Sequence, residues 1–265
     1  MNNEIHDYSF DNNTQQAKVN GKVYNPSTTS STSLSFIGKV FLTMFIGLLI
    51  TTAVSVGTAY LYAGLLNAYK ADQTALDSIT TGFLVAVIAS GVGLLIMSFV
   101  LPIMFVRGKH NILVPGIIYT VLMGILLSIE VIFTDPKILL LALGLTTVIF
   151  GLMALIGFLG KGRMTGLGIA IIGLFAGLVI LSIINIVITL LNPDTSMTLY
   201  WIISLGFFAV IMLITIWDMR QIKLIAERGE GQGNNVVLYC AFIIYTDFIS
   251  ILIRLIYYLG IASKK

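Results

Sequence analysis

The sequence predicts an all-α membrane protein with seven transmembrane helices. Of its 265 residues, 57% are hydrophobic and 10% are charged, whereas about a quarter of the residues in soluble domains are charged. The mean hydropathy is +0.99. Seven stretches reach the roughly 20 apolar residues that a helix needs to cross a bilayer, and none alternates as barrel strands do. They define a transmembrane domain over 36–261, with spans at about 36–66, 79–106, 112–133, 137–159, 167–191, 198–222 and 236–261.

Breaks in the apolar pattern separate these helices in order. The first stretch is long enough to tilt or to extend past the hydrocarbon. A glycine-rich polar segment at 229–236 separates the sixth stretch from the seventh. Because the connections are short, consecutive helices should pack as antiparallel neighbours. Polar or helix-breaking residues end the second to fifth stretches at 107–111, 135–136, 160–163 and 192–194.

Residues 1–35 are predicted to form a disordered cytoplasmic tail. The runs 12–16 and 27–33 contain only Asn, Gln, Ser and Thr, so the region has little apolar surface to bury. No apolar segment precedes residue 36. We therefore expect no cleaved signal peptide, and the first helix directs insertion.

The distribution of lysine and arginine predicts a cytoplasmic N-terminus and a C-terminus outside, because cytoplasmic loops carry the excess of basic residues. The net charge of +3 is spread over these loops, so membrane lipid is an expected partner and nucleic acid is not. Four basic residues fall on the outer side: Lys70, Lys137, Lys264 and Lys265. Ten fall on the side of the N-terminus: Lys18, Lys22, Lys39, Arg107, Lys109, Lys161, Arg163, Arg220, Lys223 and Arg228.

No pattern in the chain is typical of an enzyme or of a resident cofactor. His6 lies in the tail and His110 in a loop, each without a partner for a catalytic or metal cluster. The Gly-x-Ser-x-Gly and His-Glu-x-x-His motifs are absent. The single cysteine, Cys240, excludes intrachain disulfides and cysteine-rich metal sites. Two aspartates can share a proton in aspartyl proteases, but the glycine-flanked aspartates of the intramembrane members are missing here.

Asp218 and Asp247 are the candidate functional residues. Each interrupts an apolar stretch, where a charged side chain costs about 2.5–3.5 kcal/mol on insertion scales and usually serves a function. Asp218 lies eleven residues before Gly229, and Asp247 lies eleven residues after Val236. If the two stretches form an antiparallel hairpin, equal rise along each helix brings both carboxylates to the same level.

Two neighbouring carboxylates form a candidate proton sensor and a weak, transient calcium site. Carboxylates a few ångströms apart cannot both ionise easily, so they titrate as a unit. Our hypothesis is that protonation holds the helices together through a shared hydrogen bond, and that loss of the second proton separates them or recruits a cation. Oxygen ligands suit hard ions such as Ca²⁺, whereas thiolate and imidazole ligands for Zn²⁺ are missing.

Two further intramembrane charges each permit two interpretations. Arg254 follows Asp247 by seven residues, about two helical turns, so both project from one face. Arg254 either joins the aspartates in one polar seam or extends its side chain to the outer interface. Glu130 lies near the outer end of the third stretch, either as an interfacial carboxylate or as an acidic mouth of a cation path.

Four segments carry a family resemblance: 119–128 (YTVLMGILLS), 146–165, 216–223 (IWDMRQIK) and 238–255. In order, spacing and aspartate positions they resemble the Bax inhibitor-1 family, also called the transmembrane Bax inhibitor motif family, over about 36–261. The resemblance, to bacterial members, implies the cytoplasmic membrane and a fold in which the last helix is central and six surround it.

The resemblance also implies a pH-sensitive calcium leak in which Asp218 and Asp247 form the proton sensor. Characterised bacterial relatives use a basic residue in the second helix as a latch, but 79–106 contains no Lys or Arg, which leaves Arg254 as the candidate substitute. Some bacterial members instead modulate a membrane-bound AAA protease, so a non-conducting modulator is one alternative. A proton-coupled cation exchanger, which would use the same pair, is another.

Overall fold

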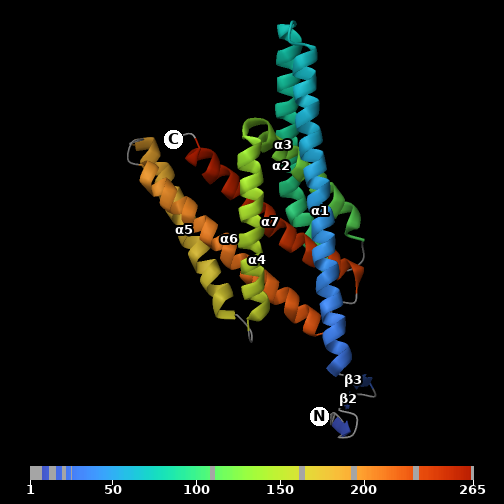
Figure 1. The fold of residues 1–265 in the computed structure, drawn as a ribbon. Helices are drawn as coiled ribbons and strands as arrows, with labels where there is room; N and C mark the ends of the chain where they lie inside the picture. Colours follow the sequence, from blue (N-terminus) through green and yellow to red (C-terminus); the bar gives the residue numbers. More distant parts are fainter. Residues whose placement is uncertain are drawn as a thin grey trace.

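A computed structural model describes residues 8–11, 16–19, 22–24, 26–107, 111–160, 165–191, 196–228 and 233–263. Within these ranges seven helices are long and apolar enough to cross a membrane, which confirms the predicted fold class. Figure 1 shows that α1 and α2 project beyond the other helices at the end opposite the N-terminus. The helices are α1 (Pro26–Ala68), α2 (Gln73–Arg107), α3 (Leu113–Phe133), α4 (Pro136–Leu159), α5 (Thr165–Leu191), α6 (Ser196–Glu227) and α7 (Asn234–Ala262).

Two helices extend past their predicted bounds at polar ends. α2 begins at Gln73 rather than near 79. The Asp72 carboxylate accepts a hydrogen bond from the Ala75 N–H at 3.2 Å, and such a side chain caps a helix start. α6 continues to Glu227 rather than ending near 222. In its last turns Lys223 pairs with Glu227 at 3.6 Å, an i,i+4 contact that supports a helix.

The described parts of the N-terminal tail have regular backbone structure, where the sequence predicted none. β1 (Tyr8–Asp11), β2 (Gln16–Val19) and β3 (Lys22–Tyr24) form an antiparallel sheet in the order β1-β2-β3. The remaining residues before 26 lie outside the described ranges, and so does the disorder predicted for them. α1 begins at Pro26, inside the predicted tail, and proline is favoured at the first position of a helix.

α7 is the central helix of the bundle, as the family resemblance implies. Half of its span is buried, at 50%, compared with 11–28% for the other six. α1, α2, α3, α4 and α6 all pack against α7, and Figure 1 shows α7 crossing the bundle obliquely behind α4. α5 packs against α6 and is the least buried helix. About half of the α7 span is therefore shielded inside the bundle.

Two glycines allow close contacts between the helices that surround α7. A Cβ atom at Gly124 of α3 would lie 2.8 Å from the Thr51 carbonyl oxygen of α1, and one at Gly157 of α4 would collide with the Ile216 carbonyl oxygen of α6. Small residues at such points let membrane helices approach closely. The contact at Gly157 holds the part of α6 that carries Asp218 directly against α4.

Candidate ion site on the central helix

Asp247 lies near the middle of α7 and is buried, with 7% of its surface exposed. It shares a face with Cys240, Ile244 and Ile251, which are all buried and stand at helical spacing from it. The Oδ2 atom of its carboxyl group is shielded from solvent and has no hydrogen-bond partner among the described residues. A buried polar atom without a partner costs roughly 1–3 kcal/mol. A proton or a cation on this oxygen would supply a missing partner.

Thr215 of α6 is the polar neighbour of Asp247 across the interface. Its side chain lies within hydrogen-bonding reach of the Asp247 carboxyl group, and it is 1% exposed. The Thr215 hydroxyl also donates to the Ile211 carbonyl oxygen at 3.1 Å. Thr215 was not among the site residues predicted from the sequence. The sequence feature that could have identified it is its spacing of three residues from Asp218, which places both side chains on the same face of α6.

Asp218 lies on the face of α6 that is turned toward α7. Its charge acts on Asp247 and also on Tyr239 and Cys240, nearer the start of α7. The structure therefore brings the two aspartates together. Asp218 follows Thr215 by three residues, about 4.5 Å along the axis of α6, toward the α6–α7 connection.

Arg254 belongs to the same α6–α7 interface but does not contact the aspartates. Its guanidinium group donates to the Ser204 hydroxyl at 3.3 Å and lies 6.0 Å from the centre of the Phe207 ring. Tyr258, one turn further along α7, donates to the Ser204 carbonyl oxygen at 2.8 Å. Within the described residues Arg254 forms no ion pair with Asp218 or Asp247. Arg254 thus occupies the end of the polar seam remote from the α6–α7 connection and makes no direct latch.

Among the side chains that the structure describes, α2 also has no basic residue that could act as the latch. α2 has no Lys or Arg before its last residue, Arg107, and the Arg107 side chain lies outside the described part of the chain.

Glu130 is partly buried near the C-terminal end of α3. Its carboxylate accepts a hydrogen bond from the Thr134 hydroxyl at 3.5 Å, just beyond the last residue of the helix. This position fits an interfacial carboxylate at the end of a span. The structure does not bring Glu130 to the aspartate pair.

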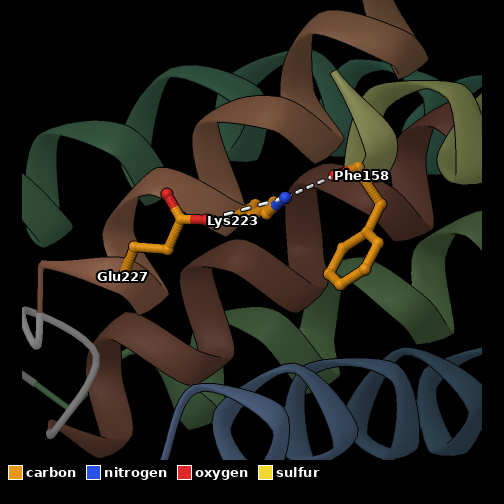
Figure 2. Close-up of polar contacts among 3 residues, drawn as sticks. All are labelled: Phe158, Lys223 and Glu227. Carbon is orange, nitrogen blue, oxygen red and sulfur yellow. Dashed lines mark hydrogen bonds and ion pairs between the residues drawn. The ribbon is translucent and has the colours of Figure 1, made fainter. Parts of the chain in front are cut away.

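Lys223 anchors the polar end of α6 to α4, a contact that the sequence analysis missed. Figure 2 shows its ammonium group between the two helices, where it donates to the Phe158 carbonyl oxygen at 2.7 Å and pairs with Glu227 at 3.6 Å. The same group lies 4.7 Å from the centre of the Phe158 ring. The last carbonyl groups of a helix lack intrahelical partners and carry partial negative charge. Lys223 satisfies one of them and so fixes α6 beyond Asp218.

The site has few ligands for a metal ion. In the part of the chain that the structure describes, no three His, Cys, Asp or Glu side chains group closely enough to hold one. Ca²⁺ usually takes about six to eight oxygen ligands. Two carboxylates would leave most positions to backbone carbonyls and water, which suits an ion in transit better than a stored ion.

Comparison with known proteins identifies a family. The family model described as "Inhibitor of apoptosis-promoting Bax1" matches residues 34–264. The match includes all seven helical spans, from Ser35 to Ala262, and with them both aspartates. A search of curated proteins finds no significant match.

Proposed function

The chain belongs to the Bax inhibitor-1 family, and from this premise we propose that it is a pH-sensitive cation leak, for Ca²⁺, in the cytoplasmic membrane. One observation carries the proposal. Asp247 is buried on the central helix beside Asp218, and one of its carboxylate oxygens has no partner among the described residues. A carboxylate at membrane depth that lacks a fixed partner is typical of an ion or proton path.

In the closed state Asp247 carries a proton. Its carboxyl group then donates to the Thr215 hydroxyl, which in turn donates to the Ile211 carbonyl oxygen. This chain of hydrogen bonds joins α7 to α6 without a buried charge at Asp247. The polar seam stays closed because both helices remain in contact.

In the open state the pair has lost its second proton. Two like charges on adjacent helices repel each other, and a cation between them compensates both. The Asp218 charge also acts on Tyr239 and Cys240. Tyrosine and cysteine side chains are ordinarily neutral near pH 7. The two carboxylates are therefore the groups that serve as the sensor. We therefore expect calcium flux to rise as the pH rises.

Calcium flux into proteoliposomes, measured across a pH series, tests the proposal. Asp247→Asn and Asp218→Asn should each flatten the pH dependence, because each leaves a single ionisable carboxyl group. Asp77→Asn is the matched control, since Asp77 is exposed on α2 far from the pair. An unchanged pH profile in both site variants would remove the aspartates as the sensor.

The same measurement distinguishes the alternatives. No flux at any pH in the wild-type protein would exclude conduction and leave a non-conducting modulator of a membrane protease. Calcium uptake against its own gradient, driven by an imposed proton gradient, would instead identify a proton-coupled exchanger. A leak shows no such uptake, because only the calcium gradient drives it.

A further inference from the structure

A groove opens between α1, α3 and α7. Its volume is about 100 Å³. The floor includes Met44, Leu101 and Ala241, which are 6%, 2% and 2% exposed, and the rim includes Ile46 and Ile117, which are 48% and 43% exposed. The groove is thus a recess with a buried floor whose open side faces the surrounding lipid. Its α7 residues stand on a different face of that helix from Asp247.

The groove offers hydrocarbon rather than hydrogen-bonding groups. Four residues on its wall carry a hydroxyl, and those of Thr43, Thr120 and Tyr245 already have partners. Thr43 donates to the Lys39 carbonyl oxygen at 2.8 Å, Thr120 donates to the Ile117 carbonyl oxygen at 2.8 Å, and the Tyr245 hydroxyl lies 2.6 Å from that of Thr51. Apolar cavities of this size stay dry and accept apolar ligands. An alkyl chain fits this recess better than water does.

One basic residue marks the end of the groove. Lys39 precedes Thr43 by four residues and Ile46 by seven, so it stands on the same face of α1, one turn below the groove. The Lys39 side chain is exposed, and it forms no ion pair within the described residues. The apolar span of α1 begins at Ser35, so Lys39 lies about one turn inside the end of the span, from where a lysine side chain can extend to the lipid head groups.

The start of α3 lies at this same end, because Ile112 and Leu113 line the groove. A helix N-terminus carries partial positive charge. Positive charge therefore gathers where the head group of a lipid would lie, while the rest of the groove is apolar.

We propose that this groove binds one anionic glycerophospholipid, with its phosphate group at Lys39 and an acyl chain in the recess between α1, α3 and α7. A bilayer supplies this ligand at high concentration. The lipid would lie against a different face of the central helix from Asp247, so it is placed to hold α7 in position.

Native mass spectrometry of the full chain tests the proposal. The protein is extracted from vesicles of equal parts phosphatidylglycerol and phosphatidylcholine, and the retained lipids are identified. The wild-type protein should retain one phosphatidylglycerol. Gly116→Leu should reduce retention about tenfold, because a side chain at this groove residue enters open space and takes up the volume of the acyl chain. Lys39→Gln should keep a bound lipid but lose a preference for phosphatidylglycerol of about fivefold.

Two variants serve as controls. Gly144 of α4 is exposed and also has open space around its Cβ position, so Gly144→Leu should retain the lipid. Lys137 is an exposed lysine at the start of α4, and Lys137→Gln should keep the preference. Gly116→Ala, with a thermal melt of each variant, separates a filled groove from a misfolded protein.

Equal lipid retention by the wild-type protein and Gly116→Leu would overturn the proposal. An unchanged preference in Lys39→Gln would overturn the assignment of the phosphate group. Neither readout depends on calcium flux, so the result holds whether or not the chain conducts.

Discussion

The Thr215 side chain and the Asp247 carboxyl group lie within hydrogen-bonding reach across the α6–α7 interface, while Thr215 also donates to Ile211 at 3.1 Å. A hydroxyl has one proton to donate and two lone pairs to accept with. Both contacts can therefore exist together only when Asp247 supplies the second proton. An ionised Asp247 would require Thr215 to turn away from Ile211.

Thr215→Val tests this relationship directly. Valine has nearly the shape of threonine but cannot accept the hydrogen bond, so the protonated state loses about 0.5–1.5 kcal/mol. The pH of half-maximal calcium flux should then fall, by up to about one pH unit. Thr147→Val is the matched control, since Thr147 is exposed on α4 and also donates to its own helix, to Leu143. A midpoint that rises would mean that Thr215 stabilises the ionised form instead.

Arg254→Gln should shift the same midpoint in the opposite direction. Arg254 stands about 10 Å from Asp247 along α7, and its positive charge favours an ionised carboxylate. At an effective dielectric constant of about 20 the attraction is about 1.6 kcal/mol, so its removal should raise the midpoint by at most about one pH unit. Arg254→Lys, which keeps the charge, is the control. If Arg254 acted as a direct latch, Arg254→Gln would abolish gating altogether.

Lys223 and Glu227 should differ sharply in their effect on stability, although they form one ion pair. Lys223 is 22% exposed and Glu227 48% exposed, and exposed pairs contribute about 0–1 kcal/mol. The bond from Lys223 to the Phe158 carbonyl oxygen carries a charge and is worth about 1.5–3 kcal/mol. Thermal unfolding should therefore show a clear loss for Lys223→Met and little change for Glu227→Gln. Equal losses would assign the stability to the ion pair.

The spans could be predicted from the sequence because the bilayer demands long apolar helices, and this requirement is visible residue by residue. The polar ends of the helices could not be predicted in this way. The extension of α2 depends on the Asp72 cap, and that of α6 on Lys223, whose partner is a backbone carbonyl of α4. Because every residue has a backbone carbonyl group, the sequence does not indicate which one accepts such a hydrogen bond.

The functional site was likewise only partly predictable from the sequence. Asp218 and Asp247 stand out because a carboxylate is costly in an apolar helix. Thr215 does not stand out, because a threonine in a membrane helix can satisfy its hydroxyl on its own backbone, as many do here. The groove between α1, α3 and α7 was invisible for another reason, since an empty volume depends on how three helices pack.

Because the chain has one cysteine, the predicted orientation can be tested by adding single cysteines without first replacing the native one. Cys240 is 0% exposed, so a membrane-impermeant maleimide should leave the wild-type protein unlabelled. Lys70→Cys and Ser263→Cys, both exposed positions on the side opposite the N-terminus, should react in intact cells. Ser35→Cys, exposed at the start of the α1 span, should react only after permeabilisation. The reverse pattern would place the N-terminus outside, and the α6–α7 connection beside Asp218 would then face the exterior.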